Sequence, residues 1–261
     1  MHVPIGIGSC TGGFDDEKVL NCCAIFATLE VSKRGIKMKN KIPVIIMDDH
    51  QSIVDGYLFR LRNIPEIVVL DVLSYGDELE PSLKKHPAAV VLLDVQVPTS
   101  PTNPNPYPIL HTIPKLLDLY PDLALLVISM HNDHGLIRAV VEAGASGYIL
   151  KDDRERIQGL GKWVIAVASG EVCFSEKALK AFLKKNDESL TGRQLEALSL
   201  CASYPNSKTA ELARKMKIAN STVRNLLSNA YVKLGVQTRA AAVAKARQMG
   251  IITPESTIMQ L

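Results

Sequence analysis

Five short apolar runs alternate with segments of helical pattern between residues 43 and 168, and this alternation constrains the fold most strongly. The runs predict strands at residues 44–47, 67–70, 89–93, 123–128 and 148–150. Helical patterns lie at residues 53–61, 78–85, 109–119, 136–143 and 153–168. Parallel neighbours need right-handed crossovers, so the alternation predicts an α/β, doubly wound parallel sheet of five strands.

Polar side chains stand directly after four of these strands: Asp48 and Asp49, Asp94, Ser129, and Lys151. Ligands and chemistry gather at the carboxyl ends of the strands in an open parallel sheet. Asp94 follows four apolar residues, so we expect it to be partly desolvated yet reachable, which suits a metal ligand or a nucleophile. A turn or a helix cap explains Asp94 alone equally well.

The whole set of strand-end residues has a coherent chemistry. Three neighbouring carboxylates repel one another unless a hard cation lies among them, and oxygen ligands with open water positions suit Mg²⁺. Lys151 and Ser129 offer donors to a transferred phosphoryl group, with Asp94 as the attacking nucleophile. Each residue taken alone has an ordinary structural explanation: Asp49 as a helix cap, Ser129 as a strand end and Lys151 as a solvated charge. The order of the whole set on successive strands is a more specific indication of phosphoryl chemistry.

The charge distribution divides the chain. Residues 41–160 carry ten Lys/Arg against sixteen Asp/Glu, a net charge of −6, whereas residues 189–261 carry ten Lys/Arg against three acids, a net charge of +7. A basic half indicates a polyanionic partner. Its pattern is all helical, with four expected helices at residues 191–203, 208–215, 221–234 and 239–248. The short turn between the second and third is typical of a helix-turn-helix.

Other classes of protein are disfavoured. No apolar run approaches the roughly 20 residues that span a bilayer. The five cysteines are scattered without paired spacing, which favours neither disulfides nor zinc and is consistent with a cytoplasmic protein. Residues 1–40 receive no function, and Met38, just before the first strand, is the expected natural start. The expected divisions are an extension (1–40), an α/β domain (41–168), a linker with a helix (169–188), the helical domain (189–253) and a tail (254–261).

The α/β part resembles the flavodoxin-like receiver domain of two-component response regulators, on the motifs at residues 46–50, 91–94, 127–129 and 144–152. The resemblance implies that Asp48 and Asp49 bind Mg²⁺ together with Asp94 and the backbone carbonyl of Gln96. It implies that Asp94 accepts phosphate from a sensor histidine kinase. Ser129 and Lys151 would then contact the phosphoryl group, and Tyr148 would be the aromatic switch.

The basic half resembles the DNA-binding domain of NarL/LuxR-type regulators, on the motifs at residues 190–194, 207–213, 220–226 and 233–236. This implies that residues 221–234 form a recognition helix in the major groove of double-stranded DNA. On its outward face, Arg224 suits guanine or phosphate and Asn225 suits adenine. The full set of expected DNA-contacting residues is Lys208, Ser221, Thr222, Arg224, Asn225, Ser228 and Lys233.

Three departures from these families stand out. Residues 98–108 hold five prolines, which predicts an extended polyproline-type loop that shields Asp94, slows dephosphorylation, binds a partner or is a tolerated insertion. Ala219 replaces a capping serine, and we expect Asn220 to take that role one residue later. Gln194 stands where an acidic residue is usual, which we interpret as minor.

The preferred interpretation is a transcription factor that a sensor kinase switches on by phosphorylating Asp94, and that forms a homodimer when phosphorylated or bound to DNA. The first alternative is a phosphorylation-independent DNA-binding regulator whose receiver serves only for docking. The second is a phosphohydrolase with an aspartate nucleophile. Gln96 stands where that enzyme needs a second acid, so we expect the chain not to be an enzyme beyond its own phosphorylation and dephosphorylation.

Overall fold

The computed structural model describes residues 41–183 and 190–255. The expectations for residues 1–40, including a natural start at Met38, lie outside the described residues. Within the described ranges, no helix is long and apolar enough to cross a membrane.

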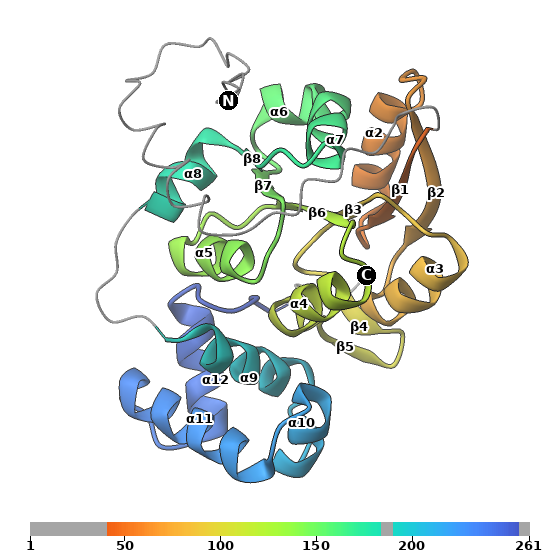
Figure 1. Cartoon of the computed structure of the whole chain (residues 1–261). Coiled ribbons are helices and arrows are strands. Elements are labelled where there is room, and N and C mark those ends of the chain that lie inside the picture. Colours follow the sequence, from red (N-terminus) through yellow and green to blue (C-terminus); the bar gives the residue numbers. More distant parts are fainter. Residues whose placement is uncertain (1–40, 184–189, 256–261) are drawn as a thin grey trace, which may run out of the picture. The chain divides into compact units, whose positions relative to one another are not determined.

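The central feature is a six-stranded sheet in which every pair of neighbours is parallel (Figure 1). Its strand order is β2-β1-β3-β6-β7-β8. Continuous apolar runs form its inner strands because both of their faces are covered. The strands are β1 (Ile42–Met47), β2 (Ile67–Leu73), β3 (Val90–Leu93), β6 (Ala124–Ser129), β7 (Gly147–Leu150) and β8 (Cys173–Phe174).

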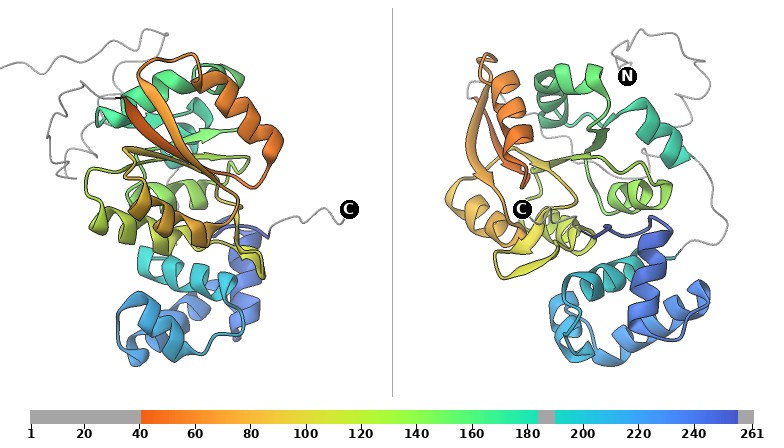
Figure 2. Two further views of the ribbon diagram at one scale, coloured as in Figure 1. Left: turned by 90° about the vertical axis from the view of Figure 1, so that its right-hand side faces the viewer. Right: turned by 180° about the vertical axis from the view of Figure 1, so that it is seen from behind.

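Helices cover both faces of the sheet (Figures 1 and 2). On one face lie α2 (Gln51–Leu61), α6 (Arg154–Gln158) and α7 (Leu160–Ala168), whose apolar side chains join those of the strands in one buried cluster. On the other face lie α3 (Leu79–Lys85), α4 (Ile109–Leu119) and α5 (His134–Glu142). The predicted doubly wound α/β class is therefore confirmed.

The structure corrects the expected elements in two places. The sheet has six strands rather than five, because Cys173 and Phe174 pair with Gly147 and Tyr148. This sixth strand is followed by α8 (Glu176–Leu183). The single helix expected at residues 153–168 is divided into α6 and α7 at Gly159, which serves as the C-cap of the first and the N-cap of the second.

The proline-rich segment is a β-hairpin, not the expected polyproline-type loop. Its strands β4 (Pro98–Ser100) and β5 (Asn103–Pro106) are antiparallel and form a separate two-stranded sheet. The buried Thr99 hydroxyl donates to the Asn105 carbonyl at 2.8 Å. Prolines are tolerated because a two-stranded ribbon has open outer edges where no N–H is required.

The base of the hairpin packs against the short 3-10 helix η1 (Gly76–Glu78). The ring of Tyr107 lies directly on Gly76, where a Cβ atom would come within 2.1 Å of the ring carbon Cγ. Only glycine fits under this ring, so Gly76 allows Tyr107, just after the hairpin, to pack closely against η1.

The basic part is all helical, as predicted (Figure 1). A tight turn centred on Lys217, whose φ of 53° is left-handed, joins its second and third helices. Gly235, with a φ of 66°, ends the third helix by the common left-handed C-cap. The helices are α9 (Gly192–Ser203), α10 (Thr209–Met216), α11 (Asn220–Leu234) and α12 (Arg239–Gln248).

The caps of these helices differ in quality. Thr191 and Gln194 form a capping box at α9, in which each side chain accepts a hydrogen bond from the other residue's backbone N–H. Glutamine therefore fills the capping position where an acidic residue is usual. At α11, the N-cap is Ala219 and no side chain caps the helix. The expectation that Asn220 takes this role is wrong, because its Oδ1 is buried without a hydrogen-bond partner among the described residues. Asn220 is already the first helical residue, one position too late to cap.

Candidate functional site

The parallel register brings the polar strand ends to one edge of the sheet. Asp48 and Asp94 follow the adjacent strands β1 and β3, and the Asp94 N–H donates to the carbonyl of Met47 at 2.9 Å. Ser129 ends β6, and Lys151, which follows β7, donates its N–H to the Ser129 carbonyl at 2.8 Å. The four side chains predicted to share a site therefore come from four neighbouring strands of the sheet.

Lys151 joins the two buried carboxylates. Its Nζ lies 2.7 Å from Asp48 Oδ2 and 2.9 Å from Asp94 Oδ2. All three side chains are at most 7% exposed, so water screens these charges weakly. The alternative explanation of Lys151 as a solvated charge is therefore excluded, because its side chain is buried.

The buried charges perturb one another. Burial raises the pKa of the Asp94 carboxyl above its ordinary value, and Lys151 offsets only part of that rise. Burial alone would lower the pKa of the Lys151 ammonium, but the charges of Asp94 and Asp48 outweigh burial and raise it. Lys151 thus remains a cation, and it lies beside a carboxylate whose charged form is destabilised by burial. Perturbed groups of this kind are typical of functional sites.

The acidic cluster has the composition and size of a cation site. One donor atom each from Asp48, Asp49, His50 and Asp94 lies within 4.8 Å of the others. Asp48 and Asp94 are buried, whereas Asp49 is exposed at the rim. Carboxylate oxygens open to water on one side are the donors that Mg²⁺ prefers, so these residues fit that ion. Gln96, whose backbone carbonyl was expected to complete the set, lies two residues after Asp94, and its backbone N–H donates to the Asp94 carboxylate.

Ser129 and Tyr148 hold the segment after β6 from two sides. The Ser129 hydroxyl accepts the N–H of His131 at 3.1 Å, and the Tyr148 hydroxyl donates to the His131 carbonyl at 2.8 Å. Tyr148 is fully buried, and burial raises the pKa of its hydroxyl. One peptide segment thus links the predicted phosphoryl-contacting hydroxyl to the predicted aromatic switch.

Sequence reasoning missed two residues near this site. Tyr57 lies within the helical pattern at residues 53–61, yet its buried hydroxyl has no hydrogen-bond partner among the described residues. Burial raises the pKa of Tyr57, and the charges of Asp48 and Asp94 raise it further. His50 is the last residue of the motif at residues 46–50, and its position directly after Asp48 and Asp49 was the available signal.

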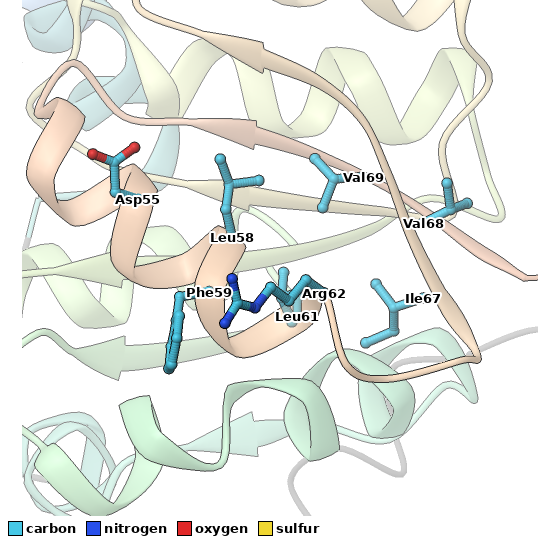
Figure 3. Close-up of a pocket in the computed structure, with 8 residues that line it drawn as sticks. All are labelled: Asp55, Leu58, Phe59, Leu61, Arg62, Ile67, Val68 and Val69. Atoms are coloured by element: carbon cyan, nitrogen blue, oxygen red, sulfur yellow. The ribbon is translucent and has the colours of Figure 1, made fainter.

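A groove of about 500 Å³ lies elsewhere, between α2 and the edge strand β2 (Figure 3). Its lining is mainly apolar and contains none of the predicted site residues. The acidic edge of the sheet is therefore the better candidate for chemistry. The lining residues are Asp55, Leu58, Phe59, Leu61, Arg62, Ile67, Val68 and Val69.

On α11, the predicted division into two faces is present. Val223, Leu227, Ala230 and Leu234 are buried, and Leu226 is half-buried. The residues predicted to contact DNA are all exposed: Lys208, Ser221, Thr222, Arg224, Asn225, Ser228 and Lys233. Arg193, by contrast, forms an ion pair with Glu196 at 2.8 Å.

Comparison with known families places both halves. Residues 44–160 match the family described as response regulator receiver domain, and residues 188–246 match bacterial regulatory proteins of the luxR family. The chain belongs to the LuxR-type response regulators. The predicted function of this chain as a DNA-binding transcriptional response regulator is thereby confirmed.

Similar proteins span nearly the same architecture. The response regulator is 28% identical to the transcriptional regulatory protein DegU of Brevibacillus brevis, over 81% of this chain and 95% of that protein. It is 29% identical to the transcriptional regulatory protein LnrK of Bacillus subtilis, over 80% of this chain and 98% of that protein. Among solved structures, it resembles the RcsB response regulator of Salmonella typhimurium, with a TM-score of 0.57 and 24% identity over 80% of this chain and 98% of that chain. This similarity supports the fold.

Proposed function

We propose that Asp94 of this response regulator accepts a phosphoryl group from the phosphohistidine of a sensor histidine kinase. The phosphorylated protein then binds double-stranded DNA as a homodimer in the cytoplasm. The observation that carries the proposal is the pair of ion contacts from Lys151 to Asp48 and Asp94, at 2.7 and 2.9 Å, at the end of the sheet where phosphoryl chemistry is expected.

The transfer needs little from the protein except position and charge. A carboxylate oxygen of Asp94 forms the new bond to phosphorus while the phosphorus–nitrogen bond of the donor breaks. The leaving imidazole keeps the electron pair of that bond and takes up a proton. Lys151, already within hydrogen-bond distance of Asp94, then pairs with the added phosphoryl oxygens.

Asp48, Asp49, Asp94 and the backbone carbonyl of Gln96 would hold Mg²⁺. When bound, this ion neutralises negative charge on the transferred group. Its protein ligands are all oxygens in this assignment, and the rim position of Asp49 leaves one side of the site to water.

The switch that we propose runs through His131. When the Ser129 hydroxyl turns to the phosphoryl group, it loses the hydrogen bond that it accepts here from the N–H of His131. The Tyr148 hydroxyl, which holds the carbonyl of the same residue, is then free to reorient. A difference of a few kcal/mol between the two receiver states suffices to change DNA binding.

In the DNA complex, α11 would enter the major groove. Arg224 suits guanine or phosphate, Asn225 suits adenine, and Ser228 lies one turn further along the same exposed face. The remaining polar residues hold the DNA backbone: Lys208, Ser221, Thr222 and Lys233.

The test is phosphorylation by a small phosphodonor such as acetyl phosphate in the presence of Mg²⁺, followed by mass spectrometry. We expect one phosphoryl group on Asp94, labile to hydroxylamine as an acyl phosphate is. Asp94→Asn should abolish it, and Asp118→Asn, which alters an exposed acid, should not. Failure to modify Asp94 would instead favour a phosphorylation-independent regulator.

A further inference from the structure

The imidazole of His50 lies against the acidic cluster and takes no part in the phosphoryl transfer proposed above. Its Nδ1 is 2.9 Å from Asp49 Oδ1 and 3.5 Å from Asp48 Oδ1. His50 is the N-cap residue of α2, yet its side chain makes no capping hydrogen bond. The ring is more than half exposed, so packing does not determine its position.

The backbone fixes His50 where a cation would bind. Its N–H donates to Asp48 Oδ1 at 3.0 Å, which holds that oxygen on the side of the histidine. Lys151, in contrast, contacts Oδ2 of both Asp48 and Asp94. The ammonium and the imidazole therefore use different oxygens, and a cation beside His50 need not displace Lys151.

The donor atoms are close enough to share one ion. Those of Asp48, Asp49, His50 and Asp94 all lie within 4.8 Å of one another. Opposite ligands of an octahedral ion such as Mg²⁺ are ~4.2 Å apart, so only a small adjustment is needed. Nδ1 of His50 shares a proton with Asp49 in this contact, and a metal ion that binds Nδ1 would release that proton to solvent. The site then has one nitrogen ligand beside oxygen ligands, which is a set that suits transition metals as well as Mg²⁺.

We propose that His50 is a nitrogen ligand of the receiver's cation site and that it shifts the preference of this site from Mg²⁺ towards Mn²⁺ and related divalent transition-metal ions. The inference rests on the cation site of the proposed function. Nitrogen ligation strengthens binding along the series from Mn²⁺ to Cu²⁺, whereas Mg²⁺ is held best by oxygens alone. The receiver would then take the more strongly bound ion when both are present.

The direct test is pulsed electron paramagnetic resonance of Mn²⁺ bound to the full chain, which detects a coordinated ¹⁴N nucleus. We expect nitrogen coupling in the wild type and its loss in His50→Ala. His50→Asn should lose it too, and asparagine retains a good N-cap for α2, so this variant separates ligand loss from a disturbed helix. His86→Ala, which alters a histidine at the end of α3, is the matched control and should keep the coupling.

Competition between the two ions gives a second measure. The concentration of Mg²⁺ that releases bound Mn²⁺ should fall by roughly tenfold or more in the His50 variants, since even the loss of an outer-shell partner costs that much at metal sites. Mn²⁺ bound without nitrogen coupling, coupling that survives in both His50 variants, or no Mn²⁺ binding would each overturn the proposal. Phosphorylation of Asp94 in Mg²⁺ is measured separately, so a normal result there leaves the proposed function intact.

Discussion

Replacing Lys151 by methionine tests how the site is held together before any phosphoryl group arrives. The substitution keeps a long side chain but leaves the carboxylates of Asp48 and Asp94 without their shared cation. Removing one partner of a buried ion pair costs about 3–5 kcal/mol, because an uncompensated charge stays buried. Asp94 can relieve part of this cost by binding a proton, since burial already raises its pKa. We therefore expect a loss near the lower limit.

The assay is urea denaturation in the presence of a chelator, followed by the fluorescence of Trp163. This is the only tryptophan of the chain, and it packs in α7 against the core of the receiver. With a urea m-value of about 2 kcal/mol/M, a loss of about 3 kcal/mol lowers the midpoint by roughly 1.5 M. Added Mg²⁺ should restore part of the loss, because it supplies the missing positive charge.

Lys177→Met is the matched control. Lys177 also contacts an aspartate, Asp152 at 2.6 Å, but both side chains are more than half exposed. Water screens that pair, so its removal should leave the midpoint nearly unchanged. Equal midpoints for the two lysine variants would refute the argument that the Lys151 contacts are buried and strong.

Three further changes probe other parts of the chain. Ala219→Ser supplies the missing cap of α11 and should stabilise the helical domain by about 1 kcal/mol in thermal denaturation, whereas Ala244→Ser on the exposed face of α12 should not. Tyr148→Phe leaves the His131 carbonyl without its donor and should cost about 1–3 kcal/mol in urea denaturation; an unchanged midpoint would show that water replaces the bond. Arg224→Ala should weaken specific DNA binding by about 1–3 kcal/mol, and unchanged affinity across a salt titration would exclude this residue as a reader.

The strands and most helices were predictable because they follow from binary patterning. A continuous apolar run between polar turns has few alternatives to a buried parallel strand, and the run before Asp94 is of this kind. The edge strand β8 escaped prediction because it is two residues long, too short for any periodicity. The break at Gly159 was hidden because the amphipathic pattern continues across it.

The hairpin at residues 98–106 was not predictable from its composition. Its four prolines indicate extended backbone but do not indicate strand pairing, because proline lacks the N–H that marks a ladder position. The side chain of Thr99, and the packing of Tyr107 on Gly76, hold the hairpin instead. Thr99 bonds a residue on the other strand of the hairpin, and Tyr107 packs on a residue 31 positions earlier in the chain. A local sequence pattern predicts neither contact.

For the candidate site, the sequence located the residues but not their partners. The order of Asp48, Asp94, Ser129 and Lys151 on successive strands predicted their convergence. That one lysine bridges two carboxylates through the Oδ2 atoms, and that His50 faces the Oδ1 atoms, depends on side-chain rotamers. The missing cap at Ala219 was visible in the sequence, whereas the failure of Asn220 to replace it required the position of the helix start.

Control of DNA binding by phosphorylation is tested by the affinity of the full chain for its operator before and after phosphorylation of Asp94. Genomic footprinting of the phosphorylated protein identifies that operator, and fluorescence anisotropy at fixed salt then measures binding. We expect tighter binding after phosphodonor and Mg²⁺ are added to the wild type, and no change for Asp94→Asn. Equal affinities for phosphorylated and unphosphorylated wild type would contradict it, and would leave the receiver as a docking module only.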